Sequence, residues 1–121
     1  MACILFVDDD TTTLEMLDKS VQILGHEALL ANSGSQALAL AVTGSPDLIV
    51  IDMMLSDMDG LALLSLLQQD PATAHIAVVI LSAGAELDAA KVSQQAGAKD
   101  YLAKPIRLQK LKEVIERYTS G

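Results

Sequence analysis

The sequence predicts an α/β domain of the (βα)5 type, in which helices cover both faces of a five-stranded parallel sheet of order 2-1-3-4-5. Three observations predict it. Apolar runs of strand length alternate five times with helical patterns, which implies right-handed crossovers between parallel strands. Acidic residues directly follow the first and third runs, so these two strands must be neighbours if the acids are to meet. No linker, repeat or low-complexity stretch interrupts the alternation, so residues 1–121 are expected to form one domain.

Five apolar runs are predicted to be the strands. They cover residues 4–7, 28–31, 48–51, 76–81 and 101–103. The first and third runs contain only apolar residues, which is typical of strands buried on both faces. The runs therefore indicate a sheet that lies between two layers of helices.

Helical patterns occupy the intervals between the runs. Two intervals show the spacing i, i+3, i+7, i+10 of a single helical face, and three show weaker versions of it. The strong patterns are Leu14, Leu17, Val21 and Leu24, and Leu108, Leu111, Ile115 and Tyr118; the weaker ones cover residues 35–42, 60–69 and 87–96.

Local signals at the helix ends agree with this division. Thr12 and Glu15 have the spacing of a capping box, which predicts that a helix begins at Thr12. Gly25, Gly44 and Gly97 stand where a helix ends in a left-handed residue, a conformation that favours glycine. The signals thus separate each helical pattern from the strand that follows it.

Composition and charge narrow the function classes. With 51% hydrophobic residues, the chain of 121 residues can bury a substantial core. A net charge of −8 argues against direct nucleic-acid binding through a basic surface. Most of the basic residues lie in the last 23 positions, where we interpret them as a solvated face of the terminal helix, with a partner's docking surface as the alternative. They are Lys99, Lys104, Arg107, Lys110, Lys112 and Arg117.

Membrane and redox signals are equally restrictive. No apolar run is long enough to span a membrane, and the N-terminus lacks the basic start and the cleavage site of a secretory signal. We therefore expect no membrane association and a cytoplasmic location. The single cysteine, Cys3, excludes an internal disulfide and a cysteine-based metal site, and it is interpreted as a small core residue.

Polar residues follow four of the five predicted strands directly. Asp8 and Asp9 come after the first strand, Asp52 after the third, Ser82 after the fourth and Lys104 after the fifth. Ligands of open α/β sheets bind at this carboxyl edge. Several carboxylates, a lysine and a hydroxyl can together hold a divalent cation and a phosphoryl group, and oxygen ligands suit Mg²⁺. The edge is thus predicted to be a site for phosphoryl chemistry.

These residues, in this order and at these positions, resemble the receiver domain of two-component response regulators, in the single-domain form typical of chemotaxis regulators. Residues 46–60 resemble that family's phosphoacceptor strand and the loop after it, and residues 96–105 resemble its last strand. The resemblance extends from about residue 3 to residue 118. It implies the flavodoxin-like version of the doubly wound sandwich and a role in phosphorelay signal transduction.

The resemblance also implies roles for the acidic residues. Asp52 would accept a phosphoryl group from a phosphohistidine of a sensor kinase or phosphotransfer protein, as an aspartyl phosphate. Asp9, Asp52 and the backbone carbonyl of Met54 would ligate Mg²⁺ directly, and Asp8 would act through water. The cofactor expected is therefore Mg²⁺, and no turnover of a separate substrate is expected.

Further roles follow for three residues near the last strands. Lys104 would pair with the phosphoryl group, and Ser82 would donate its hydroxyl to a phosphoryl oxygen. Tyr101 would change its packing as Ser82 moves inward. The surface of the fourth helix, last strand and last helix would then change, so that a partner binds or leaves, or a phosphorylation-dependent dimer forms.

Two positions depart from the family pattern, and three acids have simpler interpretations. Ser56 stands where many receivers have proline, so a more flexible loop is expected. Gly84 lies at a position that shapes the access of water to the phosphoryl group. Asp10 is interpreted as part of a helix start, and Asp57 and Asp59 as turn or N-cap residues.

Three alternatives stay open or are weakened at this point. Asp8, Asp10 and Thr12 match the Asp-x-Asp-x-Thr signature of haloacid dehalogenase-like phosphatases, in which Asp8 would be the nucleophile. That assignment leaves Asp52 without a role beside the serine and lysine. Another alternative is a receiver-shaped interaction module that is never phosphorylated. Mg²⁺ binding would distinguish a phosphorylated receiver from such a module. An EF-hand is a poor fit, because no glutamate follows Gly60 at the required spacing.

Overall fold

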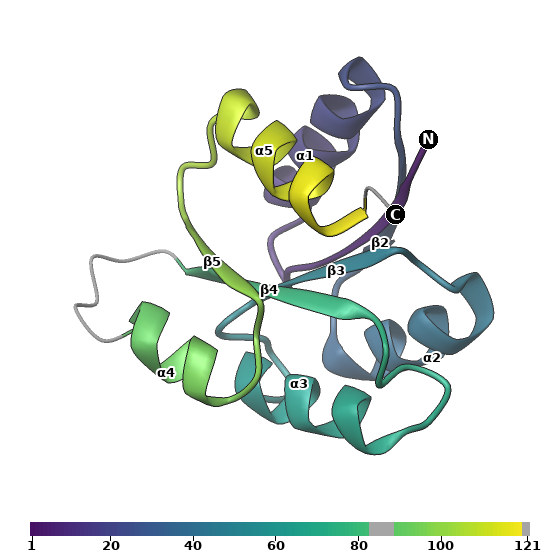
Figure 1. The fold of residues 1–121 in the computed structure, drawn as a ribbon, viewed down its shortest axis with the longest axis vertical. Helices are drawn as coiled ribbons and strands as arrows, with labels where there is room; N and C mark the ends of the chain where they lie inside the picture. The colour runs from purple at the N-terminus through teal and green to yellow at the C-terminus, as the bar shows by residue number, and fades with distance from the viewer. Residues whose placement is uncertain (83–88, 120–121) are drawn as a thin grey trace.

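The computed structural model describes residues 1–82 and 89–119, in which five strands and five helices alternate strictly (Figure 1). In chain order they are β1 (Cys3–Val7), α1 (Thr11–Ile23), β2 (Glu27–Ala31), α2 (Gly34–Gly44), β3 (Leu48–Asp52), α3 (Gly60–Gln69), β4 (Ala77–Ser82), α4 (Ala89–Gln95), β5 (Asp100–Ala103) and α5 (Leu108–Thr119). Every predicted strand and helix is present, with ends that shift by one to three residues. Residues 87–88 of the weak pattern before β5 lie outside the described residues.

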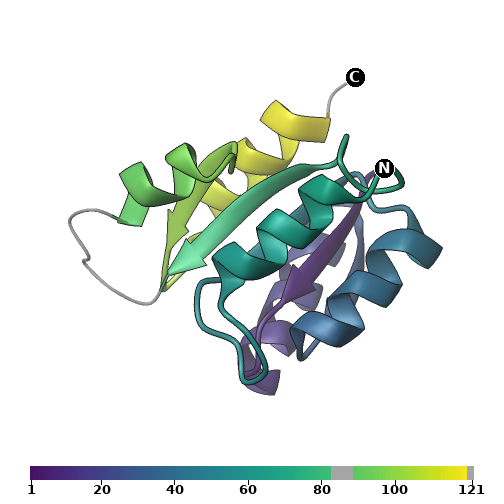
Figure 2. The ribbon, with the colours of Figure 1, turned by 90° about the horizontal axis from the view of Figure 1, so that it is seen from below.

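The strands form one parallel sheet of order β2-β1-β3-β4-β5, which confirms the predicted order. Helices α1 and α5 cover one face, and α2, α3 and α4 cover the other (Figure 1). Figure 2 views the sheet from the side of these three helices. Because β1 and β3 pair directly, the turns after them lie next to each other at the carboxyl edge.

The core consists of two apolar layers, one on each face of the sheet. Side chains alternate along β1, because successive residues of a strand point to opposite faces. Ile4 and Phe6 pack in the layer that includes α1 and α5, whereas Leu5 and Val7 pack in the layer that includes α2 and α3. All five residues of the central strand β3 are buried, as predicted for a strand between two helical layers.

The start of α1 differs from the prediction. Its N-cap is Asp10, whose carboxylate accepts hydrogen bonds from the Thr12 backbone N–H at 3.1 Å and the Thr13 hydroxyl at 2.9 Å. Thr12 is therefore inside the helix, and the proposed capping box of Thr12 and Glu15 is wrong. An acidic side chain that reaches two donors of the first turn makes the threonine redundant as a cap. The assignment of Asp10 to the helix start is confirmed.

The helix ends are partly as predicted. Gly25 and Gly97 have φ angles of 87° and 107°, so both adopt the left-handed conformation. The prediction for Gly44 is wrong, because Gly44 is the last residue of α2 and Ser45 holds the left-handed position with φ of 45°. A side chain at Gly44 would collide with Leu29 of β2, so glycine there serves the close approach of helix and sheet.

The structure can be compared with the expectations about membrane-spanning helices and about Cys3. Within residues 1–82 and 89–119, no helix combines the length and apolar character needed to cross a bilayer. Cys3 opens β1 at a half-buried position, and burial followed by the charges of Asp47 and Glu27 raises the pKa of its thiol. A raised pKa keeps the thiol protonated and unreactive, which agrees with a packing role.

Candidate functional site

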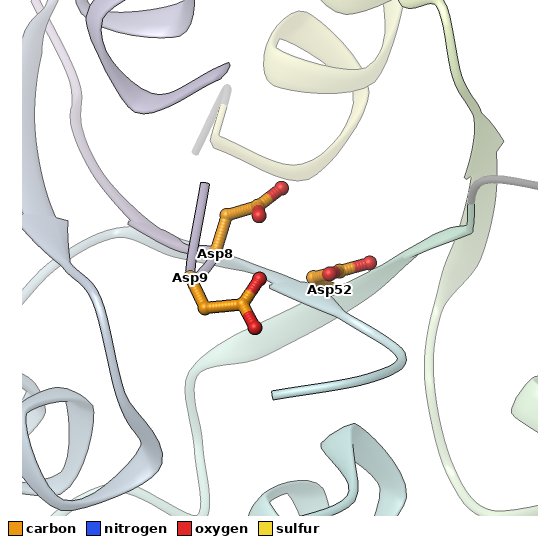
Figure 3. A group of neighbouring side chains, drawn as sticks. All are labelled: Asp8, Asp9 and Asp52. Carbon is orange, nitrogen blue, oxygen red and sulfur yellow. The ribbon is translucent and has the colours of Figure 1, made fainter. Parts of the chain in front are cut away.

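The residues predicted to form the site meet at the carboxyl edge of the sheet. Val7 pairs with Ile51 in the parallel ladder, so the next residues, Asp8 and Asp52, lie side by side where the two strands end. Figure 3 shows the carboxylates of Asp8, Asp9 and Asp52 next to one another. One oxygen from each lies within 4.8 Å of the others. The sheet order thus brings together acids that are far apart in sequence.

The three carboxylates differ in their exposure and partners. Asp8 is 1% exposed and Asp52 is 7% exposed, whereas Asp9 is open to solvent. The Asp8 Oδ1 atom accepts a hydrogen bond of 2.9 Å from the Asp10 N–H, which orients that carboxylate. The site therefore consists of two buried acids and a third that is exposed.

Lys104 reaches these acids from the end of β5. Its Nζ lies 2.7 Å from Asp8 Oδ2 and 3.8 Å from Asp52 Oδ1. A backbone hydrogen bond of 2.8 Å from the Lys104 N–H to the Ser82 carbonyl continues the ladder between β4 and β5 and places the lysine. The peptide bond between Lys104 and Pro105 is cis. The positive side chain predicted beside the acids, the Lys104 ammonium, thus lies there.

The single ammonium of Lys104 does not neutralise the three carboxylates of the site. Burial, and then the charges of Asp8 and Asp9, raise the pKa of Asp52 to about 6, against the opposing effect of Lys104. Burial lowers the pKa of Lys104, but its hydrogen bond to Asp8 and the charge of Asp52 outweigh this, so the net shift is upward. The lysine is charged at neutral pH, and the carboxylates still exceed it in charge.

The donor set fits a divalent cation that prefers oxygen. Three carboxylates at one edge repel one another unless a positive charge lies between them, and the raised pKa of Asp52 is a direct consequence of that repulsion and of burial. Within the described residues the group contains only carboxylate oxygens, without histidine or cysteine. Hard cations such as Mg²⁺ take such ligands, and softer metals favour nitrogen and sulfur.

The loop between β3 and α3, which carries Met54, is closed by its own backbone. An isolated antiparallel bridge joins Met54 to Asp59, with hydrogen bonds from Leu55 N–H to Met58 O at 3.2 Å and from Gly60 N–H to Met53 O. These bonds flank the pair, so the N–H and C=O of Met54 point away from Asp59. Met54 as a whole residue is 76% exposed.

Ser82 lies on β4, the neighbour of β3, and Tyr101 lies on β5, the edge strand that pairs with β4. Ser82 is buried at the end of β4. Tyr101 is half-buried in β5, where it pairs with Ile80 and packs against the layer that includes α3. Because Ile80 and Ser82 are two residues apart, their side chains point to the same face of the sheet. The two predicted switch residues thus lie on the same face, one on each of two paired strands.

The structure also shows a contact that the sequence interpretation missed. Asp57 was assigned to a turn or an N-cap of its own loop, whereas its carboxylate contacts the first turn of α2, accepting hydrogen bonds from the N–H groups of Gly34 and Ser35. No local pattern in the sequence predicts this contact, because Gly34 and Asp57 are 23 residues apart. Asp59, in contrast, caps α3 through the Leu61 N–H at 2.8 Å, as expected.

The chain is similar to known proteins along its whole length. The family described as the response regulator receiver domain matches residues 4–116. Protein PilH of Pseudomonas aeruginosa is 31% identical over 121 residues, and the match covers both chains completely. The phosphate regulon transcriptional regulatory protein PhoB of the same species is 35% identical over 122 residues, which are 98% of this chain and 53% of that protein. The chain therefore spans about half the length of the first curated relatives that it matches.

Solved structures agree with this. The response regulator receiver domain protein from Clostridium thermocellum is 31% identical with a TM-score of 0.89, covering 99% of this chain and 95% of that chain. The receiver domain of the Francisella response regulator 1452 is 28% identical with a TM-score of 0.90, covering 99% and 98%. The similarity thus includes the carboxyl edge that carries the acids and the lysine.

Proposed function

Because this chain belongs to the family of response regulator receiver domains, we propose that residues 1–121 form one receiver domain that is phosphorylated on Asp52. The observation that carries the proposal is the meeting of Asp8, Asp9, Asp52 and Lys104 at one sheet edge. Phosphoryl transfer needs a nucleophile, a metal site and a fixed cation within reach of one another, and this edge supplies all three.

The choice of Asp52 over Asp8 as acceptor follows from their contacts. Both oxygens of Asp8 are engaged, Oδ1 by the Asp10 N–H and Oδ2 by Lys104 at 2.7 Å. The closest approach of Lys104 to Asp52 is 3.8 Å, and Asp52 is the more exposed of the two. An oxygen without a close cation is the better nucleophile. The same contacts oppose the phosphatase alternative, in which Asp8 would attack.

In the proposed reaction an oxygen of Asp52 attacks the phosphorus of a phosphohistidine on a sensor kinase or phosphotransfer protein. The new O–P bond forms as the P–N bond breaks, and the imidazole leaves with the electron pair. Bound Mg²⁺ would offset charge on the transferring oxygens. Asp9, Asp52 and the Met54 carbonyl would hold the ion directly, and Asp8 through water. No turnover of a separate substrate is proposed.

After transfer, three residues would respond to the new charge. Lys104 would pair with a phosphoryl oxygen in place of part of its contact with Asp8. Ser82 would donate its hydroxyl to another phosphoryl oxygen, and Tyr101 would repack on the same face of the sheet. These movements would change the surface formed by α4, β5 and α5.

That surface would provide the output of the switch. Exposed basic residues lie on α5 and directly before β5 and α5: Lys99, Arg107, Lys110, Lys112 and Arg117. In a chain of net charge −8 they favour an acidic protein partner or a second copy, and they provide too little positive charge for direct nucleic-acid binding. Phosphorylation would bind or release that partner, or form a dimer.

The deciding test is intact-mass measurement after incubation with Mg²⁺ and a small-molecule phosphodonor. The parent chain is expected to gain one phosphoryl group, and Asp52→Asn none. An adduct on both chains would move the acceptor elsewhere. An adduct that disappears in Asp8→Asn and persists in Asp52→Asn would support the phosphatase alternative. Absence of an adduct on a parent chain that binds Mg²⁺ would point to an interaction module that is not phosphorylated.

A further inference from the structure

The loop between β3 and α3 is attached to a different element, α2, through Asp57. Its carboxylate accepts hydrogen bonds from Gly34 N–H at 2.8 Å, Ser35 N–H at 3.1 Å and Ser35 Oγ at 3.0 Å. The two backbone donors belong to the first turn of α2, which has no helical partners for them. Hydrogen bonds from Gly34 and Ser35 lower the pKa of Asp57, so the carboxylate is charged at neutral pH.

This contact is separate from the helix's own cap. Ser33 is the N-cap of α2, and its hydroxyl accepts from the Gln36 N–H at 3.2 Å. Gln36 in turn accepts from the Asn32 N–H through its side-chain oxygen. Ser33 and Gln36 complete the local cap, but they do not accept hydrogen bonds from the Gly34 and Ser35 amides, which donate to Asp57. Asp57 therefore adds an attachment between two segments, which the local cap does not provide.

An apolar contact lies beside the polar one. The side chain of Met58 packs so closely on Gly34 that a Cβ placed there would lie 2.5 Å from the Met58 sulfur. Two consecutive loop residues thus hold the first turn of α2, one through charge-assisted hydrogen bonds and one through packing. Exposed hydrogen bonds are individually weak. Together, the hydrogen bonds of Asp57 and the packing of Met58 hold the loop in one position relative to α2.

The attached loop is the one that carries the carbonyl of Met54. Backbone hydrogen bonds of Leu55 and Gly60 close the loop on itself, so it behaves as one unit between β3 and α3. With one end continuous with Asp52 and the far side held by Asp57, the position of Met54 is determined from both sides. A ligand carbonyl on a loop needs such support, because metal sites depend on the groups that orient their ligands.

We propose that Asp57 is a positioning residue for the metal site: by holding the β3–α3 loop against α2, it orders the Met54 carbonyl for Mg²⁺. The inference rests on the proposed function, since it assumes the cation at Asp9 and Asp52. It also predicts a link between the site and α2. Because coupling between two sites is reciprocal, Mg²⁺ should increase the exchange protection of the Gly34 and Ser35 amides.

The test is calorimetric titration of the unphosphorylated chain with Mg²⁺. Asp57→Ala is expected to bind about tenfold more weakly than the parent, the range seen when a group that orients a metal ligand is removed. Asp57→Asn, which keeps one acceptor oxygen, should lie between them. Ser33→Ala is the matched control, because it removes a cap of the same helix and leaves the loop attached; its affinity should equal that of the parent.

A second measurement follows the loop without the metal. Hydrogen exchange of the Leu55 and Gly60 amides should become faster in Asp57→Ala and stay unchanged in Ser33→Ala. Equal affinity and equal exchange in Asp57→Ala and the parent would overturn the inference and leave the proposed function intact. Equal losses in Asp57→Ala and Ser33→Ala would reduce Asp57 to a helix cap. A parent chain that binds no Mg²⁺ would overturn the proposed function itself.

Discussion

The ammonium of Lys104 lies 2.7 Å from Asp8 and 3.8 Å from Asp52, the proposed acceptor. The lysine is thus paired before any phosphoryl group arrives. A contact of this length between a buried carboxylate and a charged amine compensates for the loss of water around both. Lys104 therefore offsets part of the negative charge of the site, and under the proposed function it would turn from Asp8 toward the phosphoryl group.

Lys104→Ala should lower stability and raise metal affinity at the same time. Removal of the ammonium leaves Asp8 buried and unpaired, which should cost about 2 kcal/mol of unfolding free energy in the absence of Mg²⁺. Mg²⁺ should bind more tightly, because its competitor for the carboxylates is gone. Urea unfolding with and without Mg²⁺ measures both effects. Lys112→Ala, on the exposed face of α5, is the control, and equal behaviour of the two variants would contradict the pairing role.

Asp52 should make the metal-free domain less stable as pH rises. Its folded pKa of about 6 lies above the ordinary value of 3.8, so the folded state holds the proton more tightly than the unfolded chain does. The Asp52 contribution is therefore absent below about pH 4, becomes unfavourable between about pH 4 and 6, and is constant above. Asp52→Asn should be more stable than the parent at pH 8 by about 2 kcal/mol, because a pKa raised from 3.8 to about 6 corresponds to about 3 kcal/mol and solvent at this partly open site screens some of it.

The check is urea unfolding of both chains in a chelator across this pH range. The difference between them should vanish near the acid end. A gap that is the same at both ends would show that the stabilisation comes from the amide's packing and not from relief of charge.

Gly34 should tolerate alanine only when Met58 is shortened. A Cβ at Gly34 would clash with the flexible Met58 side chain, which must then leave its place against α2, and the loss of this packing should cost about 1 kcal/mol. In a Met58→Ala background the same substitution should lose this cost, because no side chain then occupies the place of the added Cβ. A double-mutant cycle by thermal or urea unfolding measures the coupling. Additive effects would contradict the contact.

Ser93→Ala should stabilise the domain. The Ser93 hydroxyl is buried in α4 and has no hydrogen-bond partner among the described residues. Burial of an unsatisfied hydroxyl is unfavourable, so its removal should add about 1 kcal/mol to the free energy of unfolding. Ser20→Ala is the matched control, because that helical serine donates to the Met16 carbonyl at 2.8 Å. A gain in Ser20→Ala as large as in Ser93→Ala would attribute the effect to helix propensity alone.

Much of the fold follows from local patterns. Runs such as residues 48–51 are apolar throughout because β3 lies between two helical layers, and the alternation of runs with helical spacing predicts the parallel topology. Helix ends were harder to predict. Two candidate caps compete near Thr12, and Asp10 is the one whose carboxylate reaches the first-turn donors. Gly44 has the spacing of the left-handed residue that follows a helix, but Ser45 takes that position, and spacing alone does not show that Gly44 lies against Leu29.

The candidate site was predictable in its residue types but not in its pairing. Each acid and the lysine follow a strand directly, and parallel strands deliver such residues to one edge whatever the details of packing. The sequence could therefore identify Asp8, Asp9, Asp52 and Lys104 as neighbours. It could not say which acid Lys104 would approach, because that depends on a difference of about an ångström between side chains from separate strands.

By itself, then, the sequence determined the alternation of strands and helices, the edge that carries the acids and the chemistry those acids suit, since periodicity and strand ends are local properties. The strand order followed only from the requirement that the two acidic turns meet. Only the tertiary structure decided that Lys104 pairs with Asp8, that Asp52 keeps a raised pKa, and that Asp57 holds its loop against α2. Each of these depends on distance and burial between segments brought together by folding. Coulomb and hydrogen-bond energies change steeply with both, so no pattern along the chain expresses them.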